Sequence, residues 1–124
     1  MTLRALRAAE LPKRLVCVFQ PHQHSRTRFL LNQFAQSFSS ADEVIVPHIY
    51  FVRDSIVEQQ RISAQDLVDK LIDQGVSAKN INDFDDITSH LLTTARDGDL
   101  IVIMGAGPVT SIAHSLIDQA KVTQ

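Results

Sequence analysis

The feature that most limits how this chain can fold is a regular alternation of short apolar runs with longer amphipathic segments. Runs that suit buried strands lie at 15–19 (LVCVF), 43–47 (EVIVP) and 99–104 (DLIVIM), and a weaker one lies at 78–82. A helix-like segment separates each run from the next. Such alternation favours parallel strands joined by right-handed crossovers. We therefore predict a single α/β domain over 1–124: a three-layer α/β/α, Rossmann-like open sheet, mainly parallel.

Apolar spacing and helix-boundary residues predict where the helices lie. The expected helical ranges are 2–10, from Ser25 to about 38, 63–75, 83–98, and the stretch that follows the GAG segment at 105–107. Ser63 should cap the third helix, and Ile72 and Leu92 are expected on buried helix faces. Residues 48–62 are predicted to form a long polar connection, a length typical of functional or mobile loops.

Composition argues against several classes of protein. The chain has 124 residues, 44% hydrophobic, with a net charge of −2. Without a basic excess or interleaved aromatic residues, nucleic-acid binding is not expected. Without an apolar run of about 18 residues or a secretory signal, neither a membrane span nor export is expected. Cys17, the only cysteine, lies in a strand-like run and predicts a buried thiol in a cytoplasmic protein.

The most unusual segment is VCVFQPHQHSRTRFLL, residues 16–31, where His22, His24, Arg26 and Arg28 gather at the expected start of a helix. The backbone dipole is positive at that end, so cations are disfavoured there unless a shared anion offsets the repulsion. Arg26 is suited to hold a carboxylate or phosphate with two parallel hydrogen bonds. Spacing alone leaves open that the arginines point into solvent and that His22 bonds only nearby backbone.

Topology indicates where a ligand would bind. In open parallel sheets, ligands bind beyond the carboxyl ends of the strands, where the strand order reverses. We predict that strands 15–19 and 99–104 are adjacent at the centre of the sheet. If the order is 3-2-1-4, the segment after 15–19 and the GAG segment at 105–107 face each other across that crevice. Tyr50 and Arg53 would lie on the same rim, although a solvated loop is the alternative for both. The glycines would allow a close approach of backbone, and a tight turn alone also explains them.

No catalytic motif is present in the sequence. It has no nucleophile elbow, no paired catalytic carboxylates and no P-loop lysine. His22 and His24, with His48, have a spacing that metals accept, but no carboxylate or thiol completes the set, so no metal site is predicted. The residues alone indicate a binding surface without chemistry of its own.

Three segments together resemble a known family. FQPHQHSRTR, residues 19–28, resembles the FQPH-R-[YH]-S-R-T-R motif in the C-terminal domain of bacterial Mur ligases, in the branch that joins L-alanine to UDP-N-acetylmuramate. ADEVIVPHIY at 41–50 and GDLIVIMGAG at 98–107 match in the same order, with less specificity. The resemblance covers roughly residues 3–118, and it departs from the family at Gln23, where arginine is usual.

The resemblance implies a three-domain, ATP-dependent ligase of peptidoglycan synthesis. ATP would phosphorylate the lactyl carboxylate of UDP-N-acetylmuramate, and the amine of L-alanine would displace phosphate to form an amide. This chain would be the C-terminal, amino-acid-binding domain that closes over the central ATPase domain, and it should be part of a longer protein. ATP and Mg²⁺ would be held mainly by the other domains, and no cofactor is expected in this chain.

The motif positions imply individual contacts. Arg26 would pair with the carboxylate of L-alanine, and no catalytic residue is expected in this chain. The implied L-alanine contacts are His22, Gln23, Arg26, Gly105, Ala106 and Gly107. The expected rim residues are His24, Arg28, Tyr50 and Arg53.

Two readings from other classes compete with a ligase domain. A stand-alone Rossmann-like module for small molecules or dinucleotides would need G-x-G-x-x-G after the first strand and an acid after the second. Here QPHQHSR and Pro47-His48 follow those strands. A phospho-receiver would need an acidic pocket with a phosphorylatable aspartate, whereas the predicted rim is basic.

Overall fold

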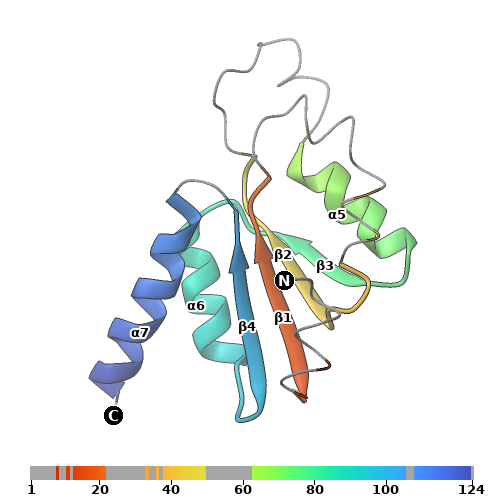
Figure 1. The fold of residues 1–124 in the computed structure, drawn as a ribbon. Coiled ribbons are helices and arrows are strands. Elements are labelled where there is room, and N and C mark those ends of the chain that lie inside the picture. Colours follow the sequence, from red (N-terminus) through yellow and green to blue (C-terminus); the bar gives the residue numbers. More distant parts are fainter. Residues whose placement is uncertain are drawn as a thin grey trace.

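Four strands and three α-helices make up the described part of the chain (Figure 1). A computed structural model describes residues 8, 11, 13–21, 33, 36, 38–49, 63–105 and 108–123. The elements are β1 (Arg14–Phe19), β2 (Glu43–Val46), α5 (Ala64–Asp73), β3 (Ser77–Asn80), α6 (Phe84–Thr94), β4 (Asp99–Met104), the 3₁₀ turn η1 (Pro108–Thr110) and α7 (Ser111–Thr123). Apart from isolated positions, the helices predicted over 2–10 and from Ser25 to 38 lie outside the described residues.

The sheet has the strand order β3-β2-β1-β4, and every pairing is parallel. This is the 3-2-1-4 order that the crevice argument assumes, and it confirms the predicted adjacency of the first and last strands. β1 and β4 pair along their full lengths, from Arg14 opposite Asp99 to Phe19 opposite Met104. The expectation that both strands lie at the centre is wrong for β4, which is an edge strand of the described sheet.

Side-chain alternation along the strands builds two cores, one on each face of the sheet. From β1, Leu15 and Cys17 point to the face covered by α5, while Val16 and Val18 point to the face covered by α6 and α7. Figure 1 shows these helices on opposite sides of the sheet. Because successive strand residues face opposite ways, strands buried on both sides are apolar at nearly every position. The predicted three-layer α/β/α fold is confirmed.

Two residues predicted to face the core are exposed. Ile72 on α5 is 52% exposed and Leu92 on α6 is 42% exposed. Each follows a fully buried leucine, Leu71 or Leu91. One residue along a helix turns the side chain by about 100°, which carries both out of the buried stripe. On α5 the inward position that the prediction missed is Val68.

Some predicted ends are wrong by a few residues. The helix expected over 83–98 ends at Thr94, because Ala95 has an extended backbone with ψ 142°. The chain then turns, and the N–H of Asp99 donates to the carbonyl of Arg96 at 3.1 Å. The strand expected over 43–47 ends one residue earlier, since Pro47 has no N–H for the ladder. The weakest predicted strand, 78–82, exists as 77–80.

Cys17 is fully buried in the core on the α5 side, as predicted. Burial raises the pKa of its thiol to about 12, because a thiolate there would lose its hydration. The residue is therefore a packing residue rather than a nucleophile. Among the described helices, none is long and apolar enough to cross a membrane.

A charged cluster lies at the amino ends of the strands. The Glu43 carboxylate is nearly buried and faces three partners: Arg14 at 3.4 Å, Lys79 at 3.6 Å and His90 at 3.0 Å. Arg14 also reaches Asp99 at 3.0 Å. These pairs join β1, β2, β3, β4 and α6 at the edge of the sheet opposite the predicted ligand crevice.

Replacing Glu43 with glutamine should destabilise the chain. Glu43→Gln keeps the size of the side chain but removes the charge that its partners face. We expect a loss of about 1–2 kcal/mol in the free energy of unfolding, since the partners are partly exposed. Urea unfolding measures it, with the exposed Asp73→Asn as the control. Equal effects of the two substitutions would contradict this role for Glu43.

Asp99 should make the stability depend on pH. The pKa of its carboxyl lies below the ordinary value of 3.8, first because the Arg96 N–H donates to it and also because Arg14 lies beside it. A lowered folded-state pKa stabilises the fold above the ordinary value, and this contribution is lost as the pH falls through the lowered pKa. Asp99→Asn should therefore cost stability at pH 7, and the difference from wild type should shrink below pH 3.8. Urea unfolding across this range checks it, and a difference that stays constant would count against it.

Candidate functional site

The exits of β1 and β4 lie side by side at the carboxyl edge of the sheet. The N–H of Gln20, just after β1, donates to the carbonyl of Met104, the last residue of β4, at 3.1 Å. The segment that follows Gln20 and the GAG segment therefore start next to each other, as the crevice argument expects. Of the predicted site residues, the structure describes Gly105 alone. The others lie outside the described residues: His22, Gln23, His24, Arg26, Arg28, Tyr50, Arg53, Ala106 and Gly107.

A glycine is required at position 105, because the backbone at the exit of β1 passes close to it. Its φ of +143° is a backbone conformation that residues with a side chain rarely adopt. A Cβ at this position would lie 2.9 Å from the carbonyl oxygen of Gln20 and 3.1 Å from Cγ1 of Val109. The atom nearest to such a Cβ thus belongs to Gln20, at the exit of β1. Val109 is itself fully buried in the core on the α6 and α7 side.

Gln20, at the carboxyl edge of the sheet, is a buried polar residue that sequence reasoning did not single out. Only 1% of it is exposed, although it carries a polar side chain. Its amide nitrogen donates to the carbonyl of His48 at 3.1 Å and lies 3.4 Å from Nε2 of the same residue. Its Oε1 is buried with no hydrogen-bond partner among the described residues. A polar residue directly after a buried strand, at a predicted switch point, is the signal that marks it.

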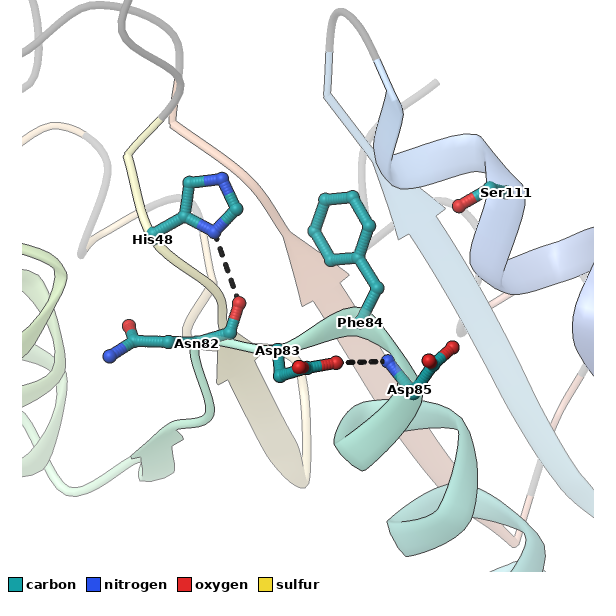
Figure 2. A pocket seen from close by; sticks show the side chains of 6 residues that line it. All are labelled: His48, Asn82, Asp83, Phe84, Asp85 and Ser111. Atoms are coloured by element: carbon teal, nitrogen blue, oxygen red, sulfur yellow. Dashed lines mark hydrogen bonds between the residues drawn. The ribbon is translucent and has the colours of Figure 1, made fainter.

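His48 connects the exit of β2 to the start of α6. Its Nδ1 lies 3.0 Å from the carbonyl oxygen of Asn82, and its ring stacks on Phe84 with centroids 5.5 Å apart (Figure 2). A carbonyl only accepts, so Nδ1 carries the proton. In the neutral ring Nε2 is then an acceptor, and it faces the Gln20 amide nitrogen. His48 is thus held in one tautomer by two neighbours.

A pocket of about 570 Å³ opens beside His48, between the first turns of α6 and α7. Asp83 caps α6 by accepting the N–H of Asp85 at 2.8 Å (Figure 2). The lining residues are His48, Asn82, Asp83, Phe84, Asp85 and Ser111. This described lining has two carboxylates and no lysine or arginine, whereas the residues of the predicted basic rim lie outside the described residues. It is suited to groups that donate hydrogen bonds.

The described residues also bear on metal binding. Among them, no three His, Cys, Asp or Glu side chains are grouped so that they could hold a metal ion. His48, the third histidine considered above, has Nδ1 against the Asn82 carbonyl and Nε2 facing Gln20. His22 and His24 lie outside the described residues.

Gly105→Ala should destabilise the chain more than a matched glycine substitution. Gly75→Ala is the control, because Gly75 also has a positive φ, +85°, but a Cβ there would have nothing within 4 Å. Both variants suffer backbone strain of about 1 kcal/mol or more. Gly105→Ala must in addition push the exits of β1 and β4 apart. Thermal and urea unfolding compare the two, and an equal loss of stability would contradict the close contact.

Comparison with known sequences assigns the chain to a family. Residues 1–107 match the model of the Mur ligase, glutamate ligase domain. The UDP-N-acetylmuramate–L-alanine ligase of Caldanaerobacter subterraneus subsp. tengcongensis is 37% identical over 109 residues, which is 88% of this chain and 23% of that protein. The ligase of the same name from Clostridium botulinum (strain Langeland) is 42% identical over 105 residues, 85% of this chain and 22% of that protein.

Solved structures share the fold. The UDP-N-acetylmuramate-alanine ligase from Thermotoga maritima superposes with a TM-score of 0.71 at 16% identity, covering 98% of this chain and 24% of that one. A murein peptide ligase from Psychrobacter arcticus gives 0.71 at 22% identity, covering 94% and 23%. The chain thus spans about a quarter of the length of these relatives. With the motif after β1, the parallel sheet and the family match in agreement, the chain belongs to the Mur ligase family, as its glutamate ligase domain.

Proposed function

We propose that this chain is the amino-acid-binding, C-terminal domain of a cytoplasmic, ATP-dependent ligase that joins L-alanine to UDP-N-acetylmuramate. The names of the relatives support this reaction, since two ligases so named are 37% and 42% identical over most of the chain. The partners would be L-alanine, UDP-N-acetylmuramate, ATP and the central ATPase domain. Mg²⁺ and ATP would be held mainly by domains that this chain does not include.

The pairing of β1 with β4 is the observation that carries the proposal. Because of this pairing, the FQPHQHSRTR segment and the GAG segment leave the sheet next to each other. The N–H of Gln20 donates a hydrogen bond to the Met104 carbonyl, and Gln20 packs on Gly105. The first segment supplies arginines suited to a carboxylate, and the second supplies backbone without side-chain bulk. A pocket at this place suits a small molecule with one carboxylate, such as an amino acid.

The chemistry of amide formation assigns this domain a binding role. The acyl phosphate would be formed where ATP and the lactyl carboxylate are held, so this domain has to deliver the amine in line with it. His22, Gln23 and Arg26 would hold L-alanine, with Gly105, Ala106 and Gly107 across the pocket. His24, Arg28, Tyr50 and Arg53 would form the rim. The low-bulk GAG backbone would let the amino acid lie close to the domain.

The reaction is tested on the longer ligase that carries this chain. Phosphate release is followed with ATP, Mg²⁺ and UDP-N-acetylmuramate, with and without L-alanine, and the product is identified by mass. We expect release that depends on L-alanine and a product heavier by one alanyl residue. Glycine and L-serine as alternative substrates test the amino-acid specificity. Release that is independent of any amino acid would contradict the proposal.

The 124-residue chain by itself separates this proposal from the other classes. It should release no phosphate from ATP above the blank, since it has none of the groups that handle a transferred phosphoryl group. Titration calorimetry with L-alanine, NAD and acetyl phosphate then compares the three functional hypotheses directly. Heat with NAD would favour a dinucleotide module, and heat with acetyl phosphate a phospho-receiver.

Arg26 should be the strongest single contributor to amino-acid capture. If Ser25 caps the helix, Arg26 lies in its first turn, where its fork can hold a carboxylate bidentately, which lysine cannot do. Losing such a bond costs about 1.5–3 kcal/mol, so Arg26→Lys should raise the KM for L-alanine about 10- to 150-fold. Steady-state kinetics on the longer ligase measure this change.

Two further variants act as controls for Arg26. Arg28 is two residues on, about 200° around the helix, so Arg28→Ala should have the smaller effect. Gln23→Arg restores the charge that is usual in the family and should tighten L-alanine binding. An Arg26→Lys enzyme with its KM within about twofold of wild type, beside an Arg28→Ala enzyme raised about tenfold, would assign the role to Arg28.

A further inference from the structure

Gln20 joins the three strand exits from which all the predicted site segments leave the sheet. We propose that Gln20 is a positioning residue of the amino-acid pocket, which holds the exits of β1, β2 and β4, where the predicted pocket segments begin, at a fixed spacing. The inference rests on the proposed function, and it assigns a role to a side chain that would not itself touch the substrate.

The contacts of Gln20 run in three directions. Its N–H donates to the Met104 carbonyl at 3.1 Å, which ties it to β4. Its side-chain amide donates to the His48 carbonyl at 3.1 Å, which ties it to the segment after β2. Its carbonyl oxygen lies where a Cβ on Gly105 would be 2.9 Å away. Two of these contacts are made by the Gln20 backbone, and the side chain adds the link to the exit of β2.

The orientation of the Gln20 amide is fixed by its neighbours. Its nitrogen faces two acceptors, the His48 carbonyl and, at 3.4 Å, the unprotonated Nε2 of His48. With the amide flipped, Oε1 would face both acceptors and no donor. The observed orientation leaves Oε1 buried and without a partner among the described residues.

The Oε1 of Gln20 is buried and has no hydrogen-bond partner among the described residues. Such a group destabilises the fold, whereas an apolar side chain of similar length avoids the loss. Groups of this kind in native proteins call for an explanation, and a role in a functional site is one of them. Here predicted pocket residues lie close along the chain to Gln20 and to its contacts. His22 lies two residues after Gln20, Tyr50 two residues after His48, and Ala106 directly after Gly105.

The distinguishing experiment measures binding and stability on the same variants of the longer ligase. Gln20→Met keeps the length of the side chain but removes both the donor to His48 and the unsatisfied acceptor. Thr88→Val is the matched control, because Thr88 is also buried and its hydroxyl donates to the Phe84 carbonyl within α6. If Gln20→Met does not fold, Gln20→Leu is compared instead, since it also removes both the donor and the acceptor.

We expect Gln20→Met to raise the KM for L-alanine about 5- to 10-fold, the effect of one lost hydrogen bond on pocket geometry. The KM for ATP and the midpoint of thermal unfolding should stay close to wild type. Nitrogen-15 NMR of His48 adds a spectroscopic readout: the Nδ1–H tautomer should dominate in wild type and lose population in Gln20→Met. Thr88→Val should change neither the KM for L-alanine nor the His48 signals.

Each contrary result has a distinct meaning. An unchanged KM for L-alanine in a folded Gln20→Met or Gln20→Leu enzyme would overturn the positioning role while leaving the proposed function intact. A parallel rise in the KM for ATP together with a lower unfolding midpoint would also overturn it, in favour of a structural role. A wild-type ligase without L-alanine-dependent phosphate release would overturn the proposed function, and this inference with it.

Discussion

The parallel pairing of β1 with β4 is the interaction on which the rest of the structure depends. It brings residues 85 positions apart, such as Arg14 and Asp99, into one ladder and makes the strand order reverse at β1. Because parallel strands end on the same side, the segments after β1, β2 and β4 all leave from one edge. The same pairing fixes the sheet faces, so Leu15 and Val16 are buried in different cores.

The two edges of the sheet have different chemistry. At the amino edge, Arg14 pairs with both Glu43 and Asp99, and Lys79 and His90 also lie beside Glu43. At the carboxyl edge, Gln20 has a buried acceptor without a partner among the described residues, and Gly105 has a backbone conformation that few other residues tolerate. The ion pairs described above thus lie at one edge, and these two destabilising features lie at the edge that the proposed function uses.

The sequence predicted the fold well because the strands are buried on both faces. Near-continuous apolar runs such as 15–19 and 99–104 have to be buried on both faces, and few arrangements other than a covered parallel sheet do this. Helix faces were less predictable, since Ile72 and Leu71 are adjacent and equally apolar, and only the packing of α5 decides which is buried. The charged cluster around Glu43 joins residues from four strands and α6, so no local pattern contains it.

The site was predictable only in part, for a related reason. The motif located the segment after β1, and the strand order placed it beside Gly105. The role of Gln20 depends on hydrogen bonds to His48 and Met104, which are far away in the sequence. The acidic pocket beside His48 arises where two helix starts meet, a juxtaposition that spacing along the chain does not contain.

The central claim is that the carboxyl edge of this sheet holds the incoming amino acid. Hydrogen–deuterium exchange on the longer ligase tests it most directly, with UDP-N-acetylmuramate and a non-hydrolysable ATP analogue present throughout and L-alanine added or omitted. The account predicts that L-alanine slows exchange in peptides covering 19–28, 48–53 and 104–108 and leaves the amino edge, around 13–15, 42–43 and 95–99, unchanged. Protection at the amino edge, or none at the carboxyl edge, would contradict it.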